Sequence, residues 1–121
     1  MKVDAVALRR DFGAFVAALK DAHQFLAQWI PDLAIAWERE LLLPALTVEA
    51  PEQVLDDVRY LAKYVRVFWG GGPLSRSERY IPRPIFEEQL RLNNELDDKC
   101  GRASLAGDAL LARLEPKPRY R

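Results

Sequence analysis

The sequence predicts a single all-α domain, an irregular antiparallel bundle of about four helices in which the last helix is long. Apolar residues recur at three- and four-residue spacing over several long stretches, which is the period of an amphipathic helix. No stretch shows the strict alternation that is typical of a strand. The chain has 121 residues, half of them hydrophobic, which suffices for one core. We expect residues 1–115 to form one helical domain and residues 116–121 to form a flexible basic tail.

The first predicted helix spans residues 4–29, with Asp4 suited to cap its N-terminus. Pro31 lacks an N–H and restricts the residue before it, so this helix should end or kink there. The core-facing stripe of the helix comprises Leu8, Phe12, Phe15, Leu19, His23, Leu26 and Ile30.

A short second helix begins at Pro31, and Pro44 is expected to close or kink it, with residues 45–50 as a connector. Pro51 and Glu52 are typical of a helical first turn, where no N–H is needed and the dipole favours a carboxylate. A third helix should therefore start there. Its core stripe comprises Val54, Val58, Leu61, Val65 and Phe68.

Three consecutive glycines, residues 70–72, are expected to stop the third helix, because glycine commonly ends helices. A phosphate-binding loop is the alternative, but such loops follow a strand and open a helix. Residues 73–84 are predicted to form an ordered, irregular crossover that ends where Pro84 opens the last helix. Within that helix, Cys100, Ala103 and Gly107 form a strip of small residues, which should let another helix, expected to be the first, approach closely.

Eighteen acidic and eighteen basic residues cancel, yet their distribution along the chain is uneven. Residues 32–57 hold seven acidic residues against one basic residue, whereas residues 58–83 hold six basic residues against one acidic residue. Tyr60, Tyr64 and Tyr80 lie among these arginines. Tyrosine and arginine are enriched at protein interfaces, and the same mixture suits single-stranded nucleic acid. A solvated face, with the two segments paired inside the monomer, is the third interpretation.

The residue types that could catalyse a reaction or bind a metal are expected to have structural roles in this chain. His23 lies on the apolar stripe with no second histidine or cysteine nearby, so we expect a histidine at the core edge. Glu95, Asp97 and Asp98 should form a solvated helix face, and Cys100 should be inert in the core. We predict no enzyme activity, metal or cofactor; an enzyme centred on His23 would need a cavity beside it.

Apolar runs are interrupted well before the roughly 20 residues that are needed to cross a bilayer. The first residues also lack the apolar core of a secretory signal. The single cysteine, Cys100, cannot form an internal disulfide, which agrees with a reducing compartment. The sequence therefore predicts a cytoplasmic protein that has no membrane partner.

Two segments resemble a motif pair in small bacterial all-helical proteins of unknown function: residues 66–75, RVFWGGGPLS, and residues 94–97, NELD. The pattern in those proteins is a helix that ends in an aromatic residue and Gly-Gly-x-Gly-Ser, with a later Asn-x-x-Leu-Asp segment. In that pattern Leu-Asn-Asp follows the serine. Here residues 73–74 intervene before Ser75, and Arg76 and Ser77 stand where the Asn-Asp would follow. The resemblance implies a small accessory protein in the style of bacterial immunity proteins, which neutralise a partner toxin.

The function predicted from the sequence is non-catalytic binding of another protein, in its most specific form a toxin or effector domain. The alternative is a helical nucleic-acid or nucleotide-binding protein that uses the basic face from Arg59 to Arg83, although nucleic acid is the less favoured partner. The predicted interface comprises Tyr60, Tyr64, Trp69, Ser75, Arg76, Arg79 and Tyr80.

Overall fold

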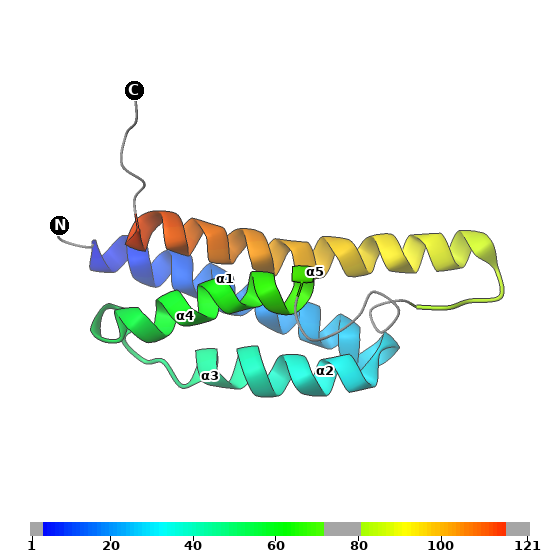
Figure 1. Cartoon of the computed structure of the whole chain (residues 1–121), viewed down its shortest axis with the longest axis horizontal. Coiled ribbons are helices and arrows are strands. Elements are labelled where there is room, and N and C mark those ends of the chain that lie inside the picture. Colours follow the sequence, from blue (N-terminus) through cyan, green and yellow to red (C-terminus); the bar gives the residue numbers. More distant parts are fainter. Residues whose placement is uncertain (1–3, 72–80, 116–121) are drawn as a thin grey trace, which may run out of the picture.

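The computed structural model describes residues 4–71 and 81–115, which form the predicted all-α antiparallel bundle (Figure 1). Four helical segments alternate in direction, and the last is the longest. The α-helices are α1 (Ala5–Trp29), α2 (Pro31–Trp37), α3 (Leu43–Leu46), α4 (Leu55–Arg66) and α5 (Phe86–Leu114). The predicted tail at 116–121 and the interface residues Ser75, Arg76, Arg79 and Tyr80 lie outside the described residues.

Helix α1 begins and ends where the sequence predicts. The Asp4 carboxylate accepts hydrogen bonds from the backbone N–H groups of Val6 and Ala7, at 3.0 and 3.2 Å. At the other end, the Ile30 N–H donates to the Leu26 carbonyl before Pro31 opens α2. The predicted stripe faces the core, since Leu8, Phe12, Phe15, Leu19 and Leu26 are buried.

Of the two outcomes expected at Pro44, closing or kinking the second helix, closing is wrong, because the helix passes this residue and continues to Leu46. Between α2 and α3 the chain forms a π-helical turn, Glu38–Leu42, and residues 31–46 form one continuous rod. The Leu43 N–H bonds to the Glu38 carbonyl, five residues earlier. A wider turn of this kind accommodates a proline that has no N–H for the regular ladder. The rod ends at Thr47, whose hydroxyl donates to the Pro44 carbonyl at 2.7 Å.

Two predicted helix starts are early by a few residues. Pro51–Gln53 forms a separate 3₁₀ turn, and α4 begins at Leu55 because Val54 has a non-helical backbone. Helix α5 begins at Phe86 rather than Pro84. The Asn93 side chain bonds to both backbone groups of Ile81, which ties the preceding segment to α5. The described end of the predicted crossover, residues 81–84, is thus ordered and non-helical.

The glycine run does not stop the helix at its first residue. Helix α4 continues as a π-helical turn, Val67–Gly71, so Gly70 and Gly71 remain helical. No described glycine has a positive φ, so neither residue acts as a left-handed cap. The remaining glycine, Gly72, lies outside the described residues.

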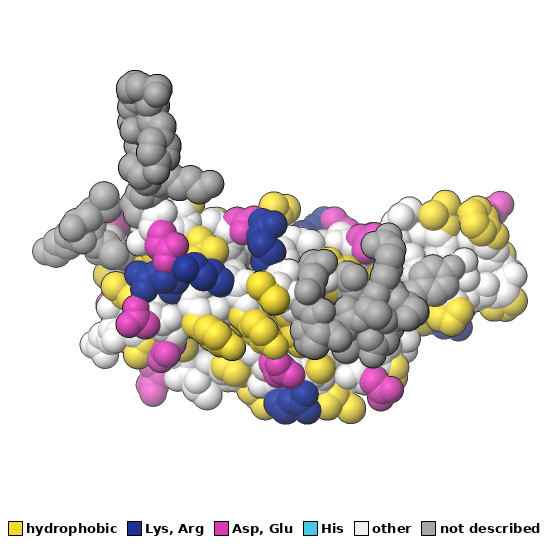
Figure 2. Space-filling view, viewed as in Figure 1, with side chains coloured by type: hydrophobic (Ala, Val, Ile, Leu, Met, Phe, Trp, Pro, Cys, Tyr) yellow, Lys and Arg dark blue, Asp and Glu magenta, His cyan; other side chains and the backbone are white. Residues whose placement is uncertain are grey.

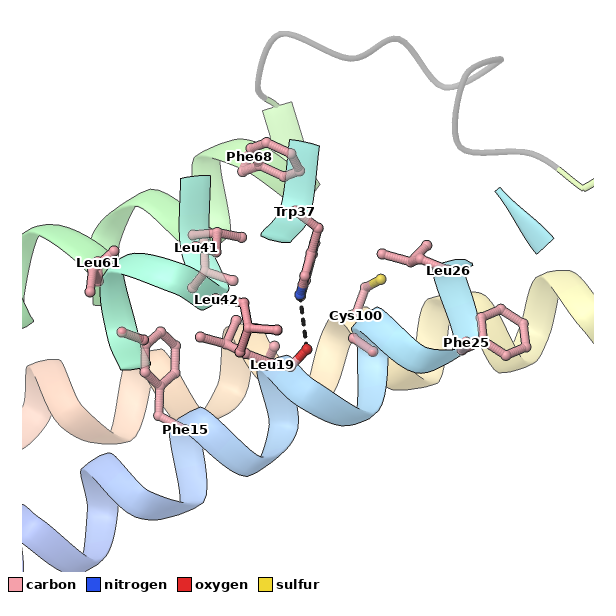
Figure 3. Packing of buried hydrophobic residues seen from close by; sticks show 14 of the residues in the cluster. Phe15, Leu19, Phe25, Leu26, Trp37, Leu41, Leu42, Leu61, Phe68 and Cys100 are labelled. Carbon is pink, nitrogen blue, oxygen red and sulfur yellow. Dashed lines mark hydrogen bonds between the residues drawn. The ribbon is translucent and has the colours of Figure 1, made fainter. Parts of the chain in front are cut away.

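Trp37 is at the centre of the core, where it is fully buried (Figure 3). Its indole N–H donates to the Leu19 carbonyl at 3.0 Å, and its ring meets Phe68 edge-on with centroids 5.9 Å apart. These contacts join α2, α1 and the π turn that follows α4, so Trp37 fixes the positions of three segments. No described helix is both long enough and apolar enough to cross a membrane.

The small-residue strip on α5 admits a helix closely, but at Gly107 that helix is α4 rather than the predicted α1. A Cβ atom at Gly107 would lie 2.8 Å from the Ala62 carbonyl oxygen and 3.0 Å from Val65 Cγ1. Cys100 and Ala103, earlier in the strip, are fully buried. Gly101 differs from Gly107, because a Cβ atom there would meet nothing within 4 Å.

Candidate functional site

Helix α4 brings two of the predicted interface residues together on one face. Tyr60 and Tyr64 are one turn apart, and their rings stack with centroids 5.6 Å apart and an interplanar angle of 13°. Tyr60 is 61% exposed, whereas Tyr64 is half-buried and meets Phe68 edge-on at 5.8 Å. A row of aromatic rings thus leads from the surface at Tyr60 to the buried Trp37.

The Tyr64 hydroxyl ties α4 to the π turn of the neighbouring rod. It donates to Glu40 Oε1, while Arg39 donates to Glu40 Oε2 at 3.0 Å. The hydrogen bond from Tyr64, followed by that from Arg39, lowers the pKa of Glu40. The same bond to Glu40 raises the pKa of Tyr64 to about 12. Tyr64 is therefore held by the hydrogen bond of its hydroxyl and by the contact of its ring with Phe68. Stacking on this fixed ring holds the neighbouring Tyr60 ring in a defined place.

We expect Tyr64 to ionise only near pH 12 in the folded protein. Because its folded pKa is raised, its hydrogen bond stabilises the fold fully below the unfolded pKa of about 10, and this contribution is lost as the pH rises through about 12. Ultraviolet difference titration measures the phenolates. The Tyr64→Phe variant keeps the ring and should lack the titration step near pH 12. If the step that disappears were instead one with an ordinary tyrosine pKa, the prediction would be contradicted.

A groove lies between α3 and α4, beside the tyrosine pair. It has a volume of about 210 Å³, and an adjoining hollow of about 450 Å³ shares Thr47, Val48 and Asp57 with it. The groove is lined by Glu40, Pro44, Thr47, Val48, Asp57, Tyr60 and Leu61. The hollow adds Glu49, Ala50, Gln53 and Val54. Carboxylates are the only charged groups that line either space among the described residues.

Exposed apolar side chains also occur on α3 and α4 outside the groove lining. Val67, two turns after Tyr60, is 52% exposed, and Leu43 and Leu46 of α3 are about half exposed. Hydrophobic side chains gather along α4 in the middle of the face shown in Figure 2. Trp69, another predicted interface residue, is half-buried and packs against the core.

The described cations of the basic segment are paired inside the chain, mostly with carboxylates of α5 and of Glu115, which follows it. Glu115 lies 2.6 Å from Arg59 and 3.3 Å from Lys63, and Arg66 pairs with Asp108. Figure 2 shows basic and acidic side chains next to one another along this boundary of α4. These pairs leave little unbalanced positive charge on the described part of the basic segment.

Arg83 completes this set of paired cations at the opposite end of the bundle. It lies 3.2 Å from Glu88, and its guanidinium carbon is 4.5 Å from the centre of the Trp29 ring. One described pair, Asp56 with Arg59, joins the acidic and basic segments as the third interpretation of the sequence would have it. The other described cations of the basic segment pair with Asp108, Glu115 and Glu88.

The remaining sequence candidates are dispersed. His23 is half-buried at the edge of the core, as predicted, and Asp98 pairs with Arg102 at 3.1 Å. Cys100 is fully buried, which places its thiol out of reach of solvent. Within residues 4–71 and 81–115, no group of three or more histidine, cysteine or acidic side chains could hold a metal ion.

Sequence reasoning missed the wall of the groove that Pro44, Thr47 and Val48 form. From the sequence, Pro44 is expected to close or kink the helix. In the structure a π turn precedes Pro44, and the rod continues beside α4. The proline itself was the available signal, since a π turn is one of the few ways to accommodate a proline within a helix.

No protein-family model matches this chain, and no curated protein or solved structure matches it. The likeness of residues 66–75 and 94–97 to small bacterial helical proteins remains an expectation from the sequence. Functional conclusions for this chain therefore rest on the surface of α3 and α4.

Proposed function

We propose that this chain is a non-catalytic protein-binding protein that docks its partner on the surface formed by α3 and α4. The exposed Tyr60, stacked on Tyr64 beside a groove, is the observation that carries the proposal. Exposed aromatic side chains next to a concave surface are the usual energetic anchors of protein interfaces.

The tyrosine pair is organised before any partner arrives. Tyr64 is held by its hydrogen bond to Glu40 and by Phe68, and Tyr60 is held by stacking on Tyr64. Immobilising a free side chain on binding costs about 0.5–1.5 kcal/mol, and a preorganised ring avoids part of this cost. The half-exposed Val67, two turns after Tyr60 on the same face of α4, supplies apolar area beside this anchor.

Toxin neutralisation in bacteria is the most specific form of the proposal. It is supported by the small all-α fold and by the resemblance of residues 66–75 and 94–97 to immunity-like helical proteins. The partner would be a toxin or effector domain met in the cytoplasm, and a toxin-domain gene is expected beside the gene for this chain. The interface would extend to Ser75, Arg76, Arg79 and Tyr80.

Nucleic-acid binding has less support on the described surface. Arg59, Lys63 and Arg66 already pair with carboxylates of α5 and of the residue after it, so a phosphate backbone would have to displace Glu115 and Asp108. Binding to nucleic acid through such cations depends steeply on salt. The groove side of α4 presents carboxylates instead, which repel phosphate.

The test is photocrosslinking in the native host, with benzoylphenylalanine replacing Tyr60. The replacement keeps an aromatic ring at the proposed anchor, and we expect a protein adduct of one defined mass. The matched control carries the same group at Leu105, which is 67% exposed on α5 outside the groove lining. Protein binding at the α3 and α4 surface is wrong if position 60 yields no protein adduct or the same adducts as position 105.

A further inference from the structure

We infer that the groove between α3 and α4 receives an arginine or lysine side chain of the protein partner. This inference rests on the proposed function and specifies the chemistry of the partner. Glu40, Asp57 and Glu49 line the groove and its adjoining hollow, and no described lysine, arginine or histidine lines either space. The partner surface that matches this charge is basic.

Two of these carboxylates are uncompensated. Asp57 and Glu49 are exposed and form no ion pair or hydrogen bond within residues 4–71 and 81–115. Elsewhere on the bundle, carboxylates such as Asp21 and Asp108 already have basic partners. A cation brought to the groove therefore gains a new ion pair and does not need to break an existing one.

The other walls of the groove suit the rest of a long basic side chain. Pro44, Val48 and Leu61 provide apolar surface for a methylene stem, and the Tyr60 ring is available for a cation to stack on. The volume of about 210 Å³ is below the ~300–1,000 Å³ of typical small-molecule sites. A single side chain fits the scale of the groove itself.

The adjoining hollow gives the partner chain a path away from the groove. It follows residues 47–50 and the first turn of α4, and it shares Asp57 with the groove. A second basic residue of the partner would meet Glu49 there. An acidic segment would meet like charges in both spaces, which disfavours the opposite choice of partner.

The experiment is an NMR titration of the full chain with the blocked peptide acetyl-Ala-Arg-Ala-Arg-Ala-amide. The control peptide carries citrulline in place of arginine, which keeps the shape and removes the charge. We expect the arginine peptide to shift the amide signals of Thr47, Val48, Asp57 and Tyr60, and added salt to reverse the shifts. Equal shifts with citrulline, or arginine-induced shifts that are not centred on these residues, would overturn the inference.

Matched variants assign the effect to the groove. Asp57→Asn should weaken peptide binding by about two- to fivefold, the range that exposed ion pairs contribute. Asp97→Asn removes an exposed carboxylate of α5 that has no ion pair with any described residue, and it should leave the affinity unchanged. Equal losses in both variants would show a general charge effect and overturn the inference. A protein adduct at position 60 without selectivity for arginine would refute the basic partner and leave protein binding standing.

Discussion

Replacement of Trp37 by alanine is expected to lower the free energy of unfolding by about 3–5 kcal/mol, the usual cost of removing a buried aromatic side chain. Trp37 is fully buried, its ring packs against Phe68, and its indole N–H bonds to the Leu19 carbonyl. The substitution leaves a cavity where α1, α2 and the π turn after α4 meet. Chemical denaturation followed by circular dichroism measures the loss.

Two further tryptophan variants make this test specific. Both Trp37→Phe and Trp37→Ala remove the hydrogen bond of the indole. Trp37→Phe keeps a ring in the core and removes only part of the volume, so it should lower the free energy of unfolding by less. Trp29→Ala removes a half-buried tryptophan that lies under Arg83, so its cost should be smaller. If Trp29→Ala were as costly as Trp37→Ala, Trp37 would not be the centre of the core.

Gly107→Ala should destabilise the protein by about 1–3 kcal/mol, the range that overpacking of a core costs. The added Cβ would lie 2.8 Å from the Ala62 carbonyl oxygen, which is backbone and cannot rotate away. Helices α4 and α5 would have to separate. Thermal and chemical unfolding of the variant measure the effect.

Gly101→Ala and Gly13→Ala are the matched controls within helices. Neither Cβ would have a non-local atom within 4 Å, so alanine gains helix propensity without a clash. Each control should stabilise the protein by up to about 1 kcal/mol. A stabilising Gly107→Ala would contradict the close approach of α4 to α5.

The elements that the sequence predicts well are those set by local spacing. The stripe from Leu8 to Leu26 and the Asp4 cap place α1 correctly, because period and capping act within a few residues. The sequence leaves closing and kinking as alternatives at Pro44, and there is a physical reason why it cannot choose between them. A π turn shifts one hydrogen bond from the fourth to the fifth preceding residue, and apolar spacing does not reveal where such a turn forms.

Only part of the candidate site can be predicted from the sequence. Tyr60 and Tyr64 are one turn apart on a predicted helix, so their shared face could be inferred. The groove opposite them depends on how the rod from 31 to 46 lies beside α4, which is a tertiary property. Two of the ion pairs of α4 reach the C-terminal part of α5: Arg59 pairs with Glu115, the residue after α5, and Arg66 pairs with Asp108, which is 42 residues away in sequence.

The π turn in the second segment links the fold to the proposed function. Glu40 lies in this turn and accepts the Tyr64 hydroxyl, and Pro44 follows it and lines the groove. Single π turns within α-helices often occur at functional sites. Here the turn supplies Glu40 to the binding surface and precedes the proline that also lines it.

The identity of the molecule that crosslinks to position 60 tests the central claim most directly. Our account predicts one protein, captured in an adduct of defined mass by the crosslinker at Tyr60 and not by the same group at Leu105. A nucleic-acid adduct at position 60, or no protein adduct at all, would contradict the account.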